Sequence, residues 1–345
     1  MSKPRKKYFI QEHLQEPYLN GGIGYTDIER ILQSEGYQPI FFPCHYSYGV
    51  IAKIRRALYL LKLFFFLPSG SLVIFLHPQY ATMNKTLVRL LGKRKSIKRV
   101  AVIGDINGLR HGNKAILQQE LALFAGYDHL IVHNPKMKKW MEEQIPSSSI
   151  SVLHFFDFLT EPKKTPAVQN TELAYAGNLA ESPFLERLNE LLPQNEGVLF
   201  KVYGQPYSPR LQEQRNLEYM GVSEPYGLPA KLEGAYGLIW DGNGLEAAED
   251  SIADYLNYIS PHKASLYILS GIPLILGRDA GIADLVQEHG IGILLDNLHD
   301  IKQALAAVST DEYQAMCANC RELAKQIASG ACTKQALLEM QKALG

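Results

Sequence analysis

The residues best suited to bind a diphosphate lie at the start of one predicted helix. Ser260-Pro261 can begin this helix, Gly271 ends it, and Pro273 opens the strand that follows. The polar residues of its first two turns are His262, Lys263, Ser265 and Tyr267. The N–H groups and the dipole at the start of a helix favour an anion. A lysine ammonium in the same turn adds a positive charge, so this turn could bind the two phosphates of a diphosphate. The alternative is a plain helix whose lysine lies in solvent.

Glycine-rich turns follow three predicted strands, at the place where ligands bind in open parallel sheets. They are Gly21-Gly22-Ile23-Gly24, Gly177-Asn178 and Tyr203-Gly204. Glycine there lets backbone N–H groups approach a phosphate, although the first turn could also serve only to pack its helix on the sheet. The spacing G-x-G-x-x-G is absent, and no acidic residue ends a second strand at the expected distance, which disfavours NAD.

Candidate catalytic residues also follow predicted strands. Asp105 is the preferred general base, with Arg110 close by as a ligand for the acceptor or for phosphate. His77 and His133 end two further strands, a place where histidine is also often structural. Asp241 precedes a glycine and could orient a sugar hydroxyl or simply form a turn. No D-x-D metal motif is present, so positive side chains must stabilise the departing diphosphate and no metal ligand is assigned.

The elements that would position these residues alternate between short β-rich runs and helical stretches. Strands are predicted at 8–11, 38–43, 72–77, 99–103, 129–133, 172–176, 197–203, 237–240, 273–276 and 292–295. The pattern fails between His154 and Thr171, which indicates a linker. The alternation resumes after Thr171, and the next helix is predicted to end at Leu191. The residues from Asp311 to the C-terminus are also predicted to be helical. Alternation in two halves predicts an α/β protein with two Rossmann-like domains, each with a parallel sheet.

The composition excludes several classes of protein. The chain has 345 residues, more than one core usually serves, and its 46% apolar and 20% charged residues are typical of folded proteins. Lys plus Arg and Asp plus Glu number 35 each, so no overall charge attracts nucleic acid. Four cysteines and no signal peptide predict a reducing cytoplasm, and the pair Cys317 and Cys320 is expected to occupy ordinary helix positions.

The longest apolar run, Ala57 to Pro68, is too short for a transmembrane helix, which needs roughly 20 residues. The cations Lys53, Arg55 and Arg56 precede it, so it could lie on a membrane surface at the inner face of the membrane. A buried core helix is the preferred interpretation.

The pattern H-K-x-S-x-Y-x-x-x-G-x-P, formed by His262, Lys263, Ser265, Tyr267, Gly271 and Pro273, resembles that of two groups of bacterial GT-B glycosyltransferases. These are the β-1,6-galactofuranosyltransferases of O-antigen synthesis and the streptococcal adhesin glucosyltransferases that act on protein-linked GlcNAc. The resemblance extends over most of the chain through the three glycine turns. It is specific for the fold and the nucleotide site but not for the sugar.

The resemblance implies a GT-B fold whose two domains face each other across a cleft. The domains would span residues 1–160, for the acceptor, and 161–325, for the nucleotide sugar, and a helix at 326–345 would cross back to the first domain. The donor would be a UDP-sugar, with no required cofactor or metal. Lys263 would bind the diphosphate and Gly177-Asn178 would lie beside the nucleotide, while the segment 221–228, with Val222, would line the uracil.

The implied reaction is transfer of galactofuranose or glucose to a glycan acceptor, lipid- or protein-linked, in the synthesis of surface polysaccharide or glycoprotein. Galactofuranose is the preferred sugar. The E-x7-E carboxylates of many retaining relatives are missing, because Ser265 and Leu266 lie where a Glu is expected. A UDP-sugar epimerase, a UDP-binding subunit without activity and a two-lobed binding protein are the alternatives. Relatives of this kind often self-associate, so a homo-oligomer is also expected.

Overall fold

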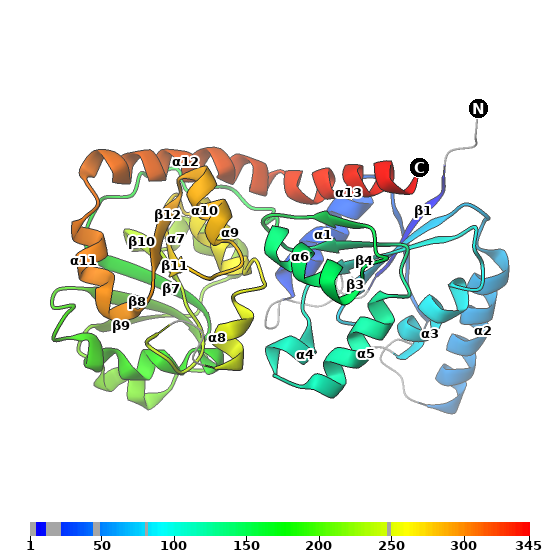
Figure 1. Cartoon of the computed structure of the whole chain (residues 1–345), viewed down its shortest axis with the longest axis horizontal. Helices are drawn as coiled ribbons and strands as arrows, with labels where there is room; N and C mark the ends of the chain where they lie inside the picture. The colour runs from blue at the N-terminus through cyan, green and yellow to red at the C-terminus, as the bar shows by residue number, and fades with distance from the viewer. Residues whose placement is uncertain (1–4, 12–21, 44–48, 80–81, 247–249) are drawn as a thin grey trace.

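The computed structural model describes residues 5–11, 22–43, 49–79, 82–246 and 250–345. Figure 1 shows two α/β lobes side by side, with a long helical segment running along the top of both. Each lobe is built on a six-stranded sheet, and all ladders between the strands of these sheets are parallel. The predicted pair of parallel sheets is therefore confirmed.

The N-terminal sheet has the strand order β2-β1-β3-β4-β5-β6. Its strands are β1 (Lys7–Ile10), β2 (Gln38–Ile40), β3 (Leu72–His77), β4 (Lys98–Ile103), β5 (His129–Val132) and β6 (Ile150–Val152). Sequence patterning missed only β6, which has three residues and follows a run of serines. The helices around this sheet are α1 (Ile23–Ser34), α2 (Val50–Phe66), α3 (Thr82–Leu91), α4 (Asn107–Arg110), α5 (Lys114–Phe124) and α6 (Pro135–Gln144).

The C-terminal sheet has the order β12-β11-β10-β7-β8-β9. Its strands are β7 (Glu172–Asn178), β8 (Leu199–Gln205), β9 (Leu217–Gly221), β10 (Tyr236–Ile239), β11 (Leu274–Gly277) and β12 (Gly292–Leu295). The missed strand here is β9, an edge strand whose residues are half-buried or exposed and show no apolar alternation. The α-helices are α7 (Leu228–Lys231), α8 (Ser251–Tyr255), α9 (His262–Leu269), α10 (Ala283–His289) and α11 (Ile301–Ala306).

Five 3₁₀ segments occur among the described residues of the second half of the chain. They are η1 (Leu179–Glu181), η2 (Pro183–Leu191), η3 (Pro209–Glu213), η4 (Pro225–Gly227) and η5 (Leu298–Asp300). The expected α-helix ending at Leu191 is therefore wrong in type. Pro183 has no N–H to donate and interrupts a continuous helix from the end of β7, while Phe184, Leu185 and Leu188 still pack in the core.

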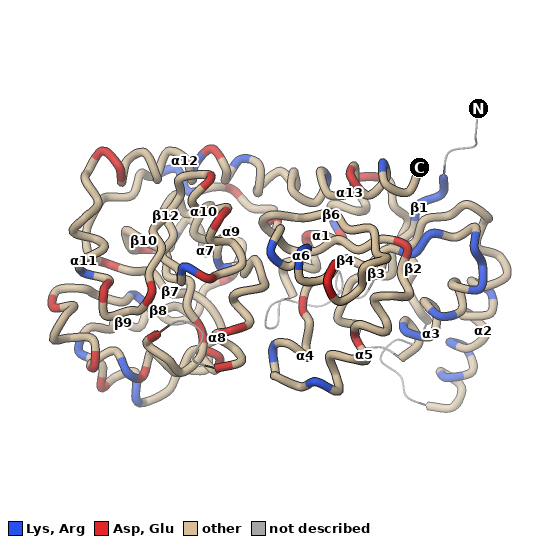
Figure 2. The backbone as a smooth tube through the Cα atoms, viewed as in Figure 1, with Lys and Arg blue, Asp and Glu red and all other residues tan. Residues whose placement is uncertain are grey.

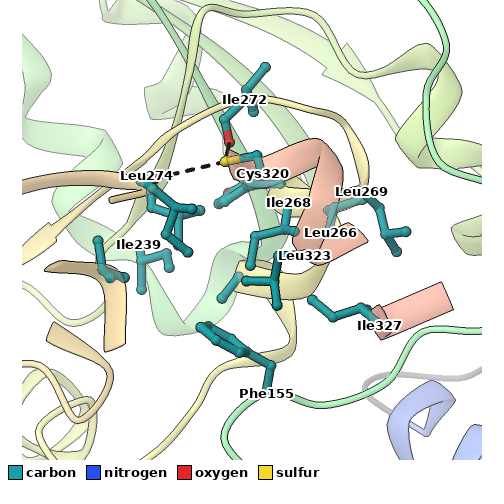
Figure 3. Packing of buried hydrophobic residues seen from close by; sticks show 14 of the residues in the cluster. Phe155, Ile239, Leu266, Ile268, Leu269, Ile272, Leu274, Cys320, Leu323 and Ile327 are labelled. Carbon is teal, nitrogen blue, oxygen red and sulfur yellow. Dashed lines mark hydrogen bonds between the residues drawn. The ribbon is translucent and has the colours of Figure 1, made fainter. Parts of the chain in front are cut away.

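The chain ends in two helices, α12 (Thr310–Ala328) and α13 (Ala331–Leu344). Between them Gly330 has a φ of 78°, a left-handed conformation that glycine adopts without strain. Helix α12 packs on the C-terminal domain against α9, where Cys320 contacts the cluster of Ile268 and Leu323 (Figure 3). Helix α13 packs on the N-terminal sheet through Leu337 and neighbouring residues. One continuous C-terminal segment therefore covers both domains.

The two cysteines of the C-x-x-C sequence, Cys317 and Cys320, are buried in α12 and form no disulfide. Burial raises the pKa of both thiols, which keeps them protonated. Among the described residues no group of His, Cys, Asp or Glu could hold a metal ion. Cys44 lies outside the described residues.

Helix α2 corrects one expectation. The preferred interpretation of the run Ala57 to Pro68 as a buried core helix is wrong, because α2 buries only Ala52 and Leu63 and exposes most of its large apolar side chains. No helix in the described part of the chain is long and apolar enough to cross a membrane.

Candidate active site

A cleft of about 1230 Å³ lies between the two domains. The carboxyl ends of strands from both sheets open into it: Asp105 follows β4, while Asn178 and Gly204 lie at the ends of β7 and β8. Eleven of the fourteen predicted site residues line this cleft: Gly22, Gly24, Asp105, Arg110, Gly177, Asn178, Tyr203, Gly204, Val222, His262 and Lys263. His77, Ser265 and Tyr267 do not. Gly21, part of the first glycine turn, lies outside the described residues.

Lys263 lies in the first turn of α9 with its ammonium held at a fixed place in the cleft. Its Nζ donates to Asp241 Oδ1 at 2.7 Å and to the Tyr175 hydroxyl at 3.1 Å. The ammonium also lies 4.6 Å from the centre of the Tyr175 ring, within cation–π range. Tyr175 and Ser182 in turn donate to Asp241, at 2.8 Å and 3.1 Å. The cleft therefore contains a preorganised cation at the N-terminus of a helix.

A lysine at a helix N-terminus is repelled by the helix dipole unless an anion lies beside it, and Asp241 is such an anion. Asp241 pairs with the ammonium, and both side chains are mostly buried, 14% and 12% exposed. Sequence reasoning treated Asp241 only as a possible sugar ligand or turn residue. A bound diphosphate would share the Lys263 ammonium with Asp241 and would also lie near the N-terminus of α9.

His262 brings the two domains together. Its ring packs at a tilt against Phe156 and Phe158 of the linker, with ring centroids 6.4 Å and 4.8 Å away. Burial lowers the pKa of His262 to about 4, so the ring is neutral at pH 7. A Cβ on Gly24 would lie 3.2 Å from the His262 ring, so the glycine of the first turn allows α1 to approach α9 closely.

Ser265 and Tyr267 lie behind the cleft and support its wall. Ser265 donates to the carbonyl of Phe156 at 2.6 Å. The Tyr267 hydroxyl accepts the N–H of Ala176 in β7 at 2.9 Å and donates to the carbonyl of Leu238 in β10 at 3.1 Å. Both side chains are fully buried. They are predicted ligands that the structure does not bring to the cleft, because inward-facing positions of a short helix pack against the sheet.

The last residues of β7 and β8 lie against each other, with Gly177 paired to Gly204 in the ladder, so the predicted glycine turns are strand ends. Gly204 has a φ of 138°, and a Cβ there would lie 2.0 Å from the carbonyl oxygen of Gly177. Only glycine permits this approach. Asn178 accepts the N–H of Ala180 at 3.2 Å and caps η1. The exposed residue Val222 lies on the same side of the cleft, next to Glu224, which caps η4.

Asp105 is held from both halves of the chain. The Tyr255 hydroxyl of α8 donates to Oδ1 at 3.3 Å, and the Tyr25 hydroxyl of α1 donates to Oδ2 at 3.5 Å. Arg110 lies 3.6 Å from Oδ1. Burial raises the pKa of the Asp105 carboxyl, although Arg110 and Tyr255 oppose the shift. A partly desolvated carboxylate of raised pKa is a stronger base than an exposed one.

Arg110 also bonds to Glu181 of the C-terminal domain, so an ion pair bridges the cleft. A second bridge joins Tyr226 to Asp27 of α1, with the hydroxyl donating to Oδ1 at 2.9 Å. The domains thus meet on both sides of the cavity. A polar ligand could bind the carboxylate of Glu181 by displacing Arg110 from it.

His77 does not reach the cleft with its ring. The imidazole Nε2 lies 3.3 Å from Glu120 Oε1, and the residue lines a second cavity, of about 520 Å³, between α3 and α5. Its backbone carbonyl instead accepts from Tyr25 at 3.3 Å. The carboxylate of Glu120 also accepts the N–H groups of Asn107 and Gly108 at 3.0 Å and 2.8 Å. The geometry gives His77 the role of positioning the loop after β4 through Glu120.

Sequence reasoning missed three residues that hold the site together: Tyr25, Glu181 and Tyr255. Tyr25 directly follows the first glycine turn and Tyr255 lies shortly before the helix of Lys263, but neither type nor spacing predicts their contacts. Tyr255 lies in the second half of the chain, yet its ring packs in the N-terminal core, beside Ile106. Its hydroxyl accepts the N–H of Ile106 at 2.7 Å. Tyr255 and Ile106 are 149 residues apart in sequence, so no local sequence pattern predicts their contact.

The chain matches known proteins along most of its length. Residues 6–154 match the model of the Glucosyltransferase 3-like N-terminal domain, and residues 173–340 that of the C-terminal domain. The chain is 26% identical over 249 residues to the beta-1,6-galactofuranosyltransferase WbbI of Escherichia coli K12, covering 70% of each protein. It is 23% identical over 282 residues to Glucosyltransferase 3 of Streptococcus gordonii, covering 78% of this chain and 79% of that protein.

A solved structure shares the whole fold. HepE of Anabaena, in complex with UDP and glucose, aligns with a TM-score of 0.62 at 12% identity and covers 98% of this chain and 100% of HepE. The predicted GT-B fold is confirmed by this match and by the two parallel sheets. Because both domain models match in the expected order and together leave little of the chain uncovered, the chain belongs to the Glucosyltransferase 3-like family.

Proposed function

We propose that this protein transfers a hexosyl group from a UDP-sugar to a glycan acceptor. Membership of a glucosyltransferase-like family and similarity to two named hexosyltransferases support this activity. The observation that carries the proposal is the Lys263 ammonium at the N-terminus of α9, inside a cleft between two Rossmann-like domains. A uridine diphosphate would place its phosphates there, and the nucleoside would lie toward Gly177, Asn178 and Val222.

In the proposed reaction, Asp105 accepts the proton of the acceptor hydroxyl, whose oxygen bonds to the anomeric carbon of the sugar while the bond from that carbon to the diphosphate breaks. Lys263 and the N–H groups of α9 stabilise the negative charge that develops on the leaving diphosphate. Arg110, on the acceptor side of the cleft, binds the acceptor or a phosphate oxygen. The N-terminal domain thus supplies the base and the C-terminal domain the electrostatic stabilisation, so the domains must close for transfer.

The identity of the sugar belongs to the proposal as well. We favour galactofuranose over glucose, because WbbI, named a galactofuranosyltransferase, is the more similar of the two relatives described above. The acceptor is a glycan, lipid- or protein-linked. The free thiols of Cys317, Cys320 and Cys332 are consistent with a reducing compartment, and we place the reaction in the cytoplasm. Self-association and independence from metal stay predictions.

The test is UDP release from UDP-galactofuranose and from UDP-glucose, with and without glycan acceptors, in the presence of Mg²⁺ and then of EDTA. We expect UDP release that depends on the acceptor and persists in EDTA. Conversion of the donor without any acceptor would instead indicate an epimerase. Binding of UDP without release from any donor–acceptor pair would indicate an inactive subunit and contradict the proposal.

A further inference from the structure

Helix α2 carries most of the exposed large apolar side chains of the described chain. Eleven such residues are exposed, and seven of them lie on this one helix. They are Val50 (73%), Ile51 (71%), Ile54 (54%), Leu58 (61%), Leu61 (49%), Phe65 (67%) and Phe66 (78%). The other four, Ile116, Val168, Val222 and Leu338, are spread over the rest of the molecule. So dense a group of exposed apolar residues normally marks a contact surface.

Six of the seven lie in one stripe along the helix. Successive residues of an α-helix are rotated by about 100°, so the positions from Val50 to Phe65 fall within a sector of about 100°. The opposite side of α2 packs on the domain through Ala52 and Leu63. The stripe therefore faces away from the core.

Cations border the stripe on both sides. By the same rotation, Lys53 lies on one flank, and Arg55 and Lys62 lie on the other. All three side chains are exposed, and α2 contains no acidic residue. An apolar stripe with cations on both flanks is the arrangement of a helix that lies in the interface of a membrane, with the cations at the level of the lipid headgroups.

The charge around α2 reinforces this pattern. The chain has a formal net charge of zero, yet no Asp or Glu occurs between Glu35 and Asp105. This segment contains eleven cations: Lys53, Arg55, Arg56, Lys62, Lys85, Arg89, Lys93, Arg94, Lys95, Lys98 and Arg99. Figure 2 shows these blue positions along α2, α3 and the neighbouring loops, at the end of the molecule away from the C-terminal domain. Asp128 pairs with Lys98 and Arg99. For Lys53, Arg55 and Lys62 of α2, no ion pair to an acidic residue is found among the described residues.

We propose that α2 docks the N-terminal domain on an anionic lipid bilayer. The helix has 17 residues and a length of about 25 Å, so it would lie in the plane of the membrane and bury its apolar stripe among the lipids. Two copies of this chain joined through the same stripe would bring two rows of like charges together, whereas anionic headgroups neutralise them. Charge complementarity therefore selects the bilayer over a second copy. This inference does not depend on hexosyl transfer.

Flotation of the purified full chain with vesicles tests the proposal. We expect binding to vesicles of phosphatidylcholine with 30% phosphatidylglycerol, weak binding to phosphatidylcholine alone, and loss of binding in high salt. The variant Leu58→Ser/Leu61→Ser/Phe65→Ser should lose binding by about tenfold or more. The variant Lys53→Gln/Arg55→Gln/Lys62→Gln should lose binding by roughly fivefold per cation removed.

Matched controls change equally exposed residues elsewhere. Val168→Ser/Leu338→Ser removes apolar groups from other surfaces, and Arg210→Gln/Lys302→Gln/Lys325→Gln removes three exposed cations of the other domain. Both controls should bind vesicles like the wild type, and calorimetric melting verifies that every variant is folded. The proposal is overturned if the wild type does not float with anionic vesicles, or if α2 and control variants bind equally. It is also overturned if the wild type forms a dimer that only the α2 serine variant dissociates and shows no vesicle binding.

Discussion

At the scale of single residues, the site rests on two carboxylates with different environments. Asp241 is paired with the Lys263 ammonium at 2.7 Å and serves to fix that cation. Asp105 has no such close cation: Arg110 is 3.6 Å away and is shared with Glu181. Burial raises the pKa of Asp105, which favours uptake of a proton. We therefore assign proton transfer to Asp105 and positioning of the ammonium to Asp241.

Replacing the proposed base separates catalysis from binding. Asp105→Asn keeps the shape of the side chain but cannot accept the acceptor proton, so kcat should fall about 10²-fold or more. Affinity for UDP should change little, because the diphosphate lies in the other domain. Steady-state kinetics and calorimetry of the same preparation measure both. An Asp105→Asn enzyme with wild-type kcat would exclude the carboxylate as the base.

The hydroxyl of Tyr255 lowers the pKa of Asp105 by donating a hydrogen bond to its carboxylate. Tyr255→Phe removes this donor, so the pKa of Asp105 should rise further. The acidic limb of the pH–kcat profile should then move to higher pH. Tyr258→Phe changes a nearby ring that packs on Trp140 and does not line the cleft, and it should leave the profile in place. Equal profiles for the two variants would contradict the proposed role of Asp105.

At the scale of secondary structure, sequence patterning succeeded where burial is complete. The strand Leu72–His77 was predicted with its observed bounds, because all six residues are buried and apolar residues are continuous through five of them. Two of the four edge strands of these sheets, β6 and β9, were missed, because they are short, partly exposed and lack an apolar run. The edge strands β2 and β12 are as short and as exposed, but the apolar runs 40–42 and 293–295 allowed them to be predicted. Helix α2 was predicted to be buried because its composition is apolar. Only the fold shows that one face of this helix has no neighbouring element to cover it in the described structure.

Prediction of the site succeeded for features that are local in sequence and failed for contacts between distant residues. Glycines whose missing side chain permits a close contact, such as Gly24 and Gly204, could be found because their spacing after a strand is local. Tyr255 and Glu181 could not be found, since their partners lie 150 and 71 residues away in sequence. Contacts of this kind arise only when the two domains come together.

Three histidines and one aspartate whose pKa values are shifted by burial predict how the free energy of unfolding depends on pH. Burial lowers the pKa of His129, His133 and His262 to about 4, and it raises that of Asp157, which accepts N–H groups at the start of α13, to about 6. Between pH 6.5 and 4 the unfolded histidines bind protons that the folded ones do not, so their contribution to stability is lost as pH falls. The folded Asp157 binds a proton more readily than the unfolded one, so its contribution has the opposite sign.

Asp157→Asn should therefore make the free energy of unfolding fall more steeply as pH is lowered from 6.5 to 4, because the opposing group is removed. Denaturant unfolding at a series of pH values measures the slope. Asp284→Asn, at an exposed position of α10, is the control and should leave the slope unchanged. A wild-type slope in Asp157→Asn would show that Asp157 does not take up a proton on folding in this range.

At the scale of the whole molecule, the ion pair between Arg110 and Glu181 is one of several contacts that join the two domains beside the cleft. Glu181→Gln weakens the bridge to Arg110 by about 1 kcal/mol, so more open molecules should be populated. Small-angle scattering should show a larger radius of gyration without ligand and the wild-type value with UDP bound. Glu190→Gln alters an exposed ion pair within one domain and serves as the control. An unchanged radius in Glu181→Gln would mean that the bridge does not govern closure.

The central claim is that Lys263 binds the diphosphate of a UDP-sugar, and calorimetric titration of UDP into Lys263→Met tests it most directly. Lys201→Met is a matched control, because Lys201 is equally buried, 11% against 12% exposed, and forms an ion pair with Glu233 at 2.7 Å, the same length as the Lys263 pair. We predict that Lys263→Met weakens UDP binding by about ten- to a hundredfold, as expected for the loss of a charged hydrogen bond, and that Lys201→Met does not. Wild-type affinity for UDP in a folded Lys263→Met protein would contradict the account.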